Sequence, residues 1–160
     1  MTRIYTRSGD DGTTVLPDGR RVRKDDPEVE ALGALDELNS AIGLARSLIR
    51  DRGLDRILAE VQNDLFQLEK APSVEKLERW IDAYEAKLPP LRRFVVPVGP
   101  LHFARAVCRR AERVCVKVMP VVYLNRLGDL LFVLARWARR GREQPVSRLR
   151  GAGRSAPAKR

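Results

Sequence analysis

The sequence predicts an all-α protein in which five helices form one bundle. Two observations point to this fold. Apolar residues recur every three or four positions in five segments between residues 28 and 140, and glycine or proline stands near most boundaries between segments. The size agrees, because 160 residues, 44% of them hydrophobic, suffice for a single compact domain. We expect this domain to cover residues 1–140, including an ordered amino-terminal loop over residues 1–27, and a basic tail to follow over residues 141–160.

The first three predicted helices are separated by stop and start signals. They are expected over residues 28–50, 54–70 and 74–88. Gly53 interrupts the apolar repeat between the first two helices. Ser73 is a suitable N-cap for the third helix, and Pro89 with Pro90 ends that helix.

The last two predicted helices, over residues 101–118 and 121–140, are the most regular. Their apolar residues follow the 3.5-residue repeat of bundle cores. A connector over residues 91–100 precedes them and contains a short extended apolar run. Phe94 lies in this connector, where it forms either part of the core or a wall of a pocket.

Each of these two helices carries a polar stripe beside its apolar seam. On the first, Arg105, Arg109 and Glu112 stand at positions i, i+4 and i+7, with Arg113 at the edge of the same face. On the second, the stripe consists of Asn125, Asp129, Phe132 and Arg136. Two antiparallel helices of this kind can present guanidinium, carboxylate and amide groups to one cleft. The ordinary alternative is a pair of solvated faces with surface ion pairs.

The amino-terminal segment has the composition of a phosphate-binding loop. Residues 6–14 combine glycines, which let backbone amides approach an anion, with hydroxyl groups, and Arg7 and Lys24 can supply positive charge. The segment is not a Walker A loop, because no Gly-Lys-Ser/Thr follows at the required spacing. A simple flexible terminus is the alternative. Asp10 and Asp11 offer oxygen ligands for Mg²⁺, although adjacent aspartates are also common turn residues.

The formal net charge of +10 is concentrated at the carboxyl terminus. Residues 136–160 contain nine basic residues and one acidic residue, a net charge of +8 that leaves +2 for the other 135 residues. The tail has few apolar residues and is predicted to be disordered. A large positive charge suits nucleic acid, an anionic surface or a polyphosphate, so its position matters more than its total.

The sequence disfavours membrane insertion, secretion, a disulfide, a structural zinc site and a catalytic histidine. No apolar run reaches the ~20 residues that span a bilayer and no signal-peptide pattern is present, so we expect a soluble cytoplasmic protein without membrane contact. Cys108 and Cys115 lie seven residues apart on a predicted helix, about 10 Å along its axis, so we expect buried reduced thiols and no disulfide. A structural zinc site lacks ligands, and the single histidine, His102, is expected to be packed or exposed, with no catalytic role.

Five blocks of sequence, in order, resemble one known family. They read RIYTRSGDDGTT over residues 3–14, RVRKDDPEVEALGALDELNSAIGLA over 21–45, LPPLRRF over 88–94, LHFARAVCRRAER over 101–113 and YLNRLGDLLFVLAR over 123–136. Together these blocks are similar to the propanediol-utilisation type of ATP:cob(I)alamin adenosyltransferase. The resemblance implies a ferritin-like bundle of five helices that assembles as a homotrimer, with ATP and the corrinoid meeting at each subunit interface.

Matching by position also assigns roles to individual residues. The resemblance implies that ATP is held by Thr6, Arg7, Ser8, Gly9, Thr14, Val15, Lys24, Arg109, Arg110, Glu112, Arg113 and Asn125. Among these, Lys24, Arg109 and Glu112 match the catalytic positions, and Val15 would act through its backbone. Asp36 and Arg105 match an ion pair on the corrinoid side, and Phe94 matches the aromatic residue that covers the lower face of cobalt. Mg²⁺ is expected with ATP, and Asp10 is its candidate ligand.

The implied chemistry suits these residue types. Co(I) is already a strong nucleophile toward the 5′ carbon of ATP, so the protein has to align the reactants and stabilise the charge on the departing triphosphate. The implied partners are a flavoprotein reductant for cobalt and an enzyme that uses adenosylcobalamin.

Two other functions remain open at the level of sequence. One is a module of the same fold that binds ATP or a corrinoid with reduced catalysis, which the short stretch between Phe94 and Leu101 would permit. The other is a basic helical protein that binds nucleic acid. This second function is disfavoured, because the sequence lacks aromatic residues among its basic ones and lacks a helix-turn-helix spacing.

Overall fold

The computed structural model describes residues 3–92, 94–140 and 142, and this part of the chain folds as a helical bundle. Its helices are α1 (Pro27–Leu48), α2 (Arg52–Leu65), the short 3₁₀ helix η1 (Leu68–Lys70), α3 (Val74–Glu85), α4 (Pro100–Cys115) and α5 (Val122–Ala138). Two short strands, β1 (Thr13–Val15) and β2 (Arg21–Arg23), precede them. The predicted all-α bundle of five helices is confirmed. Of the basic tail over residues 141–160, which the sequence predicts to be disordered, all but residue 142 lie outside the described residues.

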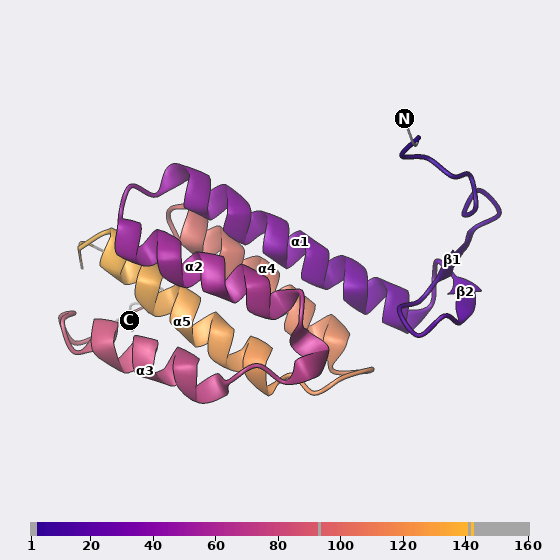
Figure 1. The fold of residues 1–160 in the computed structure, drawn as a ribbon. Coiled ribbons are helices and arrows are strands. Elements are labelled where there is room, and N and C mark those ends of the chain that lie inside the picture. The colour runs from indigo at the N-terminus through magenta and orange to yellow at the C-terminus, as the bar shows by residue number, and fades with distance from the viewer. Residues whose placement is uncertain (1–2, 93, 141, 143–160) are drawn as a thin grey trace, which may run out of the picture.

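The helices pack side by side, and the hairpin lies beyond the amino-terminal end of α1 (Figure 1). α1 packs against α2 and α4, and α5 packs against α3 and α4. The core between them is aliphatic and includes Leu38, Ile42, Leu58, Leu77, Leu124, Leu127, Leu131 and Leu134, all fully buried. The apolar stripes predicted from helical spacing are therefore the faces that the bundle buries.

Side-chain caps begin three of the helices. Asp26 is the N-cap of α1 and accepts a hydrogen bond from the amide of Glu28. Pro27 follows it as the first helical residue, and proline suits this position because it has no amide N–H that would be left unpaired. Asp51 accepts bonds from the amides of Gly53 and Leu54 at the start of α2. Ser73 caps α3 as predicted, with the amide of Lys76 as donor at 3.2 Å.

The structure shortens several predicted helices. The segment predicted as one helix over residues 54–70 is α2 followed by η1, and Ala71 then takes a left-handed conformation with φ 48°. α3 ends at Glu85, and the amide of Leu88 bonds to the carbonyl of Glu85 in a tighter turn. Leu88 itself cannot extend the helix, since a residue before proline avoids the helical region.

The hairpin was not predicted. β1 and β2 pair antiparallel with Thr14 opposite Val22, and the turn between them contains Asp18 and Gly19. The sequence Pro17-Asp18-Gly19 carries a turn signal, and Gly19 has the positive φ of 88° that such turns require. Strands of three residues show too little alternation to be recognised, which explains the omission.

Among the described residues, no helix combines the length and apolar character needed to cross a bilayer. His102 is buried and its ring lies 6.0 Å from that of Phe132, as expected for a packed histidine.

Both cysteines are buried free thiols, as predicted. The Cys108 thiol donates to the carbonyl of Leu124 at 3.3 Å, and burial raises its pKa to about 12. We predict that neither thiol reacts with a disulfide reagent in the native protein near neutral pH, because the thiolate is the reactive form. Both should react in concentrated guanidinium chloride, which serves as the control, and rapid labelling of the folded chain would contradict the burial.

The same shift gives the sign of a stability change with pH. The unfolded thiol ionises near pH 9 and the folded Cys108 thiol only near pH 12. Between these values the unfolded state alone loses a proton, so the free energy of unfolding falls as the pH rises through this window.

Candidate active site

The hairpin holds the amino-terminal loop in a defined shape. Lys24 Nζ donates to the carbonyl of Gly9 at 2.8 Å, and the amide of Gly12 bonds to the same carbonyl at 3.2 Å. Arg21 donates to the Thr13 hydroxyl at 2.5 Å and to the Ser8 carbonyl at 3.3 Å. The segment is thus an ordered loop closed from β2, with Lys24 lying across it. Sequence reasoning did not identify the role of Arg21.

The two neighbouring aspartates of the loop have different environments. Asp11 accepts hydrogen bonds from the Thr13 amide at 2.9 Å and from the Thr13 hydroxyl at 2.7 Å. These bonds, with the nearby Arg21 guanidinium, hold the pKa of Asp11 below its ordinary value. Within the described part of the chain, the exposed carboxylate of Asp10 makes no hydrogen bond or ion pair. Asp11 is therefore the turn residue, and Asp10 is the one available to a cation.

The remaining predicted loop residues lie on this exposed segment. The hydroxyls of Thr6 and Ser8 lie 2.9 Å apart, and Arg7, with φ 63°, places its guanidinium 5.7 Å from the Tyr5 ring. Thr14 and Val15 belong to β1. The loop therefore offers hydroxyls, backbone groups and two cations to solvent in one place.

The second group of predicted residues lies where α4 faces α5. Asn125 Nδ2 donates to Glu112 Oε1 at 2.9 Å, which joins the two polar stripes. Gly128 of α5 lies beneath Arg109, since a Cβ built on it would be 3.9 Å from Arg109 Cγ. Arg113 donates to the Arg109 carbonyl at 2.7 Å. This exposed hydrogen bond links the two stripes at one point, and it fits a shared cleft and a pair of solvated faces alike.

Arg110 lies apart from this group. Its guanidinium pairs with Glu37 at 2.8 Å and with Glu30 at 3.3 Å, both on α1. Position 110 is one residue, about 100°, around the helix from Arg109. The structure therefore does not bring Arg110 to the side chains of Glu112 and Asn125.

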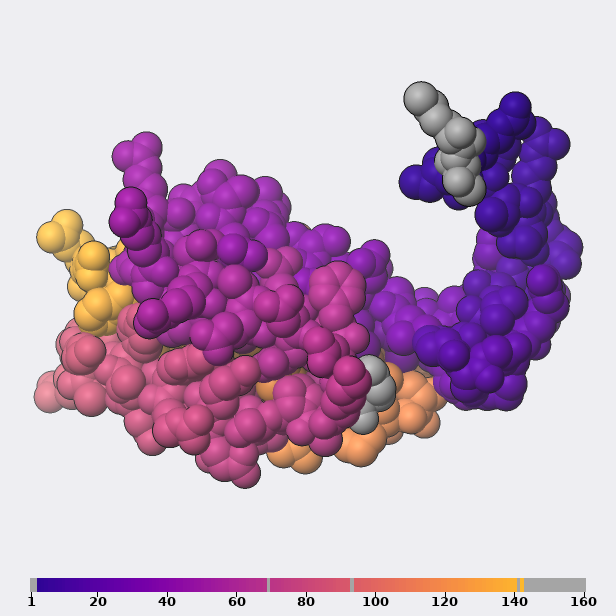
Figure 2. Space-filling model, viewed as in Figure 1, coloured from indigo at the N-terminus to yellow at the C-terminus, as the bar shows by residue number. Residues whose placement is uncertain are grey.

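The loop and the α4–α5 stripes are separate within one chain. Among the described residues, no hydrogen bond or ion pair joins residues 6–24 to residues 105–125. Figure 2 shows the amino-terminal segment curving away from the bundle as an arm. One chain therefore displays two groups of candidate ATP-binding residues that do not contact each other.

The predicted corrinoid-side residues also lie apart in one chain. Asp36 is exposed on α1, Arg105 lies on α4 with its guanidinium 5.2 Å from the Phe132 ring, and Phe94 is 89% exposed. Arg105 Nε is buried, and in the described part of the molecule no acceptor lies within bonding distance. Neither an ion pair nor a hydrogen bond links Asp36 to Arg105 in the described chain.

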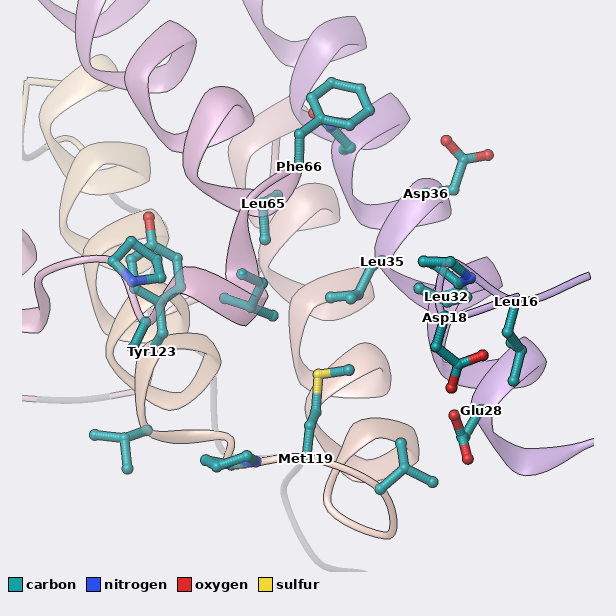
Figure 3. A pocket seen from close by; sticks show the side chains of 18 of the residues that line it. Leu16, Asp18, Glu28, Leu32, Leu35, Asp36, Leu65, Phe66, Met119 and Tyr123 are labelled. Carbon is teal, nitrogen blue, oxygen red and sulfur yellow. The ribbon is translucent and has the colours of Figure 1, made fainter. Parts of the chain in front are cut away.

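A cavity of about 780 Å³ opens beside Asp36 (Figure 3). Most of its walls are apolar and include Leu32, Leu35, Leu65, Phe66, Met119 and Tyr123. Asn39 also lines it, is 5% exposed, and its buried Oδ1 has no hydrogen-bond partner among the described groups. The lining comes from several helices and the hairpin, so no local sequence pattern could have predicted this cavity.

Comparisons with known proteins agree on one family. The family model for cobalamin adenosyltransferase matches residues 4–138. A corrinoid adenosyltransferase of Mycobacterium tuberculosis is 44% identical, with 86% of this chain and 89% of that protein aligned. A human corrinoid adenosyltransferase is 39% identical over 86% of this chain and 69% of its own length.

Solved structures show the same similarity. One is a variant of the PduO-type ATP:corrinoid adenosyltransferase from Lactobacillus reuteri, complexed with cobalamin and ATP. It superimposes with a TM-score of 0.80 at 31% identity and covers 89% of this chain and 97% of that one. Another variant from the same organism, complexed with ATP, gives a TM-score of 0.79 at 32% identity.

Proposed function

The chain belongs to the cobalamin adenosyltransferase family and is an ATP:corrinoid adenosyltransferase, and we propose that its two separated groups of ATP-binding residues meet across a subunit interface. The observation that carries this proposal is the separation itself. The arm with Lys24 stands away from the bundle, while Arg109, Glu112 and Asn125 lie on the α4–α5 face of the same chain. The arm of one chain can therefore meet the α4–α5 face of a second chain, so that the two chains together complete one site.

We propose a homotrimer as the assembly that closes this site. A cyclic arrangement places the arm of each subunit on the next and leaves no site incomplete. Large apolar side chains are available for such contacts, since Phe66 is 75% exposed, Phe103 56% and Leu32 41%. Exposed apolar residues on several faces of a soluble bundle are typical of surfaces that another chain covers.

Each half of the proposed ATP site has its own task. Lys24, Arg7 and the backbone and hydroxyls of residues 6–9 would bind the triphosphate, with Thr14 and the Val15 backbone on the adenosine. Arg109 and Arg113 would face the phosphates from the neighbouring chain. Glu112 holds the Asn125 amide through their 2.9 Å bond and so fixes a polar contact for the nucleoside. Arg110 is the weakest member, because it already pairs with α1.

Mg²⁺ fits this arrangement as an ion that accompanies ATP. It is commonly bound through one or two carboxylates together with substrate phosphates, and Asp10 is the unpaired carboxylate of the loop. When bound, Mg²⁺ would neutralise charge on the triphosphate. The described residues include no cluster of three or more ligating side chains that could hold a metal by themselves.

In the reaction, the electron pair of Co(I) attacks the 5′ carbon of ATP. The bond between that carbon and its phosphate oxygen breaks, and the triphosphate leaves with the bonding electrons. Arg109, Arg113, Lys24 and the loop amides would stabilise the negative charge on the leaving group, and the ordered loop would keep the reacting atoms in line. No side chain has to act as a nucleophile, which agrees with the absence of a reactive thiol or an exposed histidine among the described residues.

We place the corrinoid beside Asp36, Arg105 and Phe94. Asp36 on one subunit and Arg105 on the next would form their ion pair only in the assembly, which explains why each lacks that partner within one chain. The apolar cavity next to Asp36 adds a surface for the corrinoid. Phe94 would cover the lower face of cobalt and favour the four-coordinate Co(II) form. A one-electron donor such as a reduced flavoprotein would then reduce Co(II) to Co(I). An adenosylcobalamin-dependent enzyme would use the product.

The loop geometry gives a test of ATP binding. A Cβ at Gly9 would lie 3.2 Å from Lys24 Nζ, 3.3 Å from Lys24 Cε and 3.1 Å from the Thr13 carbonyl. Gly9→Ala should therefore displace Lys24 and raise the KM for ATP about tenfold, the cost of one lost charge-assisted hydrogen bond. The assay follows formation of adenosylcobalamin from ATP, Mg²⁺ and chemically reduced cobalamin.

Gly33→Ala is the matched control for this prediction. Gly33 lies on α1, and a Cβ there meets nothing within 4 Å. This variant should keep the KM of the unchanged protein. An unaltered KM in Gly9→Ala would remove Lys24 and its loop from the ATP site.

A further inference from the structure

We propose that Arg136 is a positioning residue that fixes the orientation of Phe94, and this inference rests on the proposed role of Phe94 beneath cobalt. Arg136 was noted in the sequence only as the last member of the α5 stripe. Its guanidinium donates to the carbonyl of Pro89 at 2.7 Å, at the beginning of the segment that carries Phe94.

The burial of Arg136 shows that this contact is a specific one. Arg136 is 2% exposed, although arginine is rarely buried without a compensating partner. A buried guanidinium keeps its charge and requires hydrogen-bond acceptors along its planar donors. The Pro89 carbonyl is one such acceptor, and through it Arg136 links α5 to the connector between α3 and α4.

Prolines and a bond at the far end restrict parts of the connector. We call residues 89–99 the strap, of which all but residue 93 are described. It contains Pro89, Pro90 and Pro97, whose rings fix φ and which have no amide to form other backbone bonds. At its far end, Gly99 has a φ of 105° and its carbonyl accepts from the amide of Phe103 in the first turn of α4.

Phe94 lies on the strap between these two fixed ends. Its side chain is 89% exposed, so packing within the described chain does not determine its direction. The strap backbone therefore has to set the direction, and the Pro89 carbonyl is a point at which α5 holds the start of the strap. Loss of the Arg136 bond would let the start of the strap move while the bundle stays folded.

One face of α5 supports both corrinoid-side elements. Phe132, one turn before Arg136, contacts the guanidinium of Arg105 at 5.2 Å, and Arg136 holds the strap. The spacing of four residues places both on the same side of the helix. The same face of α5 therefore contacts Arg105 and holds the start of the strap that carries Phe94. A corrinoid bound between Arg105 and Phe94 would require both to be positioned relative to one support.

The test compares Arg136→Lys with Phe94→Ala and with the double variant. Lysine keeps the charge but loses the planar set of donors. Electron paramagnetic resonance of cob(II)alamin bound with ATP distinguishes four-coordinate from five-coordinate Co(II). We expect Arg136→Lys to lower the ratio of the four-coordinate to the five-coordinate form about tenfold, equivalent to ~1.4 kcal/mol. The Kd for ATP and the turnover of pre-reduced cob(I)alamin should stay within about twofold, a spread of ~0.4 kcal/mol.

The combination of variants separates the possible failures. If Phe94→Ala leaves the spectrum unchanged, the proposed role of Phe94 fails, whatever Arg136 does. If Phe94→Ala changes the spectrum and Arg136→Lys does not, the inference about Arg136 is wrong. In the double variant we expect no further loss beyond Phe94→Ala alone, because both changes act through one side chain; additive losses would overturn the inference.

A control addresses general destabilisation. Arg126 also links α5 to a neighbouring segment, through Glu78 of α3 at 3.0 Å, but does not touch the strap. Arg126→Lys should leave the cob(II)alamin spectrum unchanged. Should Arg136→Lys lower the melting temperature and slow turnover from cob(I)alamin and cob(II)alamin equally, Arg136 would be a structural residue only and the inference would be overturned.

Discussion

Arg109→Ala should reduce adenosylcobalamin formation to a small residual rate while the chain stays folded and assembled. The Arg109 side chain is exposed on α4 above Gly128, so its removal leaves no cavity in the core. Its proposed task is to stabilise charge that develops on the departing triphosphate. Removal of one such donor lowers kcat by about 10² to 10³ in other enzymes, and we expect a loss of this size. Arg109→Lys should restore little, because lysine cannot form two parallel bonds to a phosphate.

The measurement combines steady-state rates with circular dichroism and size-exclusion chromatography. The control is Arg79→Ala, another exposed arginine, which lies on α3 outside both groups of site residues. It should retain the full rate. If Arg109→Ala turned over like the unchanged protein, the α4–α5 face would not be the triphosphate site.

Two inactive variants should restore activity when their chains are mixed. Lys24→Ala removes the cation of the arm, and Arg109→Ala removes the cation of the bundle face. Each homotrimer should be inactive, because every site would then contain one altered half. In a mixed trimer, the arm of an Arg109→Ala chain meets the α4 face of a Lys24→Ala chain, and that site is unaltered. Random mixing of equal amounts makes about one site in four intact over all trimers. Each mixed trimer has one intact site of its three, so the purified mixed assemblies should show about a third of the normal rate.

The mixing experiment requires chains that exchange or are co-expressed, followed by separation of mixed assemblies with two affinity tags. Replacing either partner by the double variant Lys24→Ala, Arg109→Ala must return the mixture to inactivity. A site completed within one chain gives no recovery in any mixture. That outcome would refute the subunit-spanning site without affecting the family assignment.

The helices were predictable because their signals are local. Apolar spacing set the buried faces, and Ser73 as well as the Pro89-Pro90 pair marked helix boundaries correctly to within a few residues. The hairpin was missed, since strands of three residues leave no measurable alternation. The early end of the helical segment was missed because Ala71 takes a left-handed conformation, which alanine rarely adopts and which its residue type therefore does not predict.

The candidate site was predictable where facing helix stripes carry its residues. Arg109, Glu112 and Asn125 were placed on facing stripes, and Glu112 and Asn125 do contact each other. The position of Arg110 on the α1 side depends on where Glu30 and Glu37 lie, which only packing decides. The role of Arg136 depends on a backbone carbonyl 47 positions away, and backbone partners leave no trace in residue type.

The buried thiols also bear on chemical selectivity. The 5′ carbon of ATP is an electrophile, and a thiolate within reach would compete with Co(I) for it and become adenosylated itself. The chain contains two cysteines, and both are buried in the bundle, with the Cys108 thiol held in its protonated form by a pKa of about 12. Burial of both thiols therefore keeps the 5′ carbon of ATP for Co(I) and protects the protein from adenosylation at cysteine.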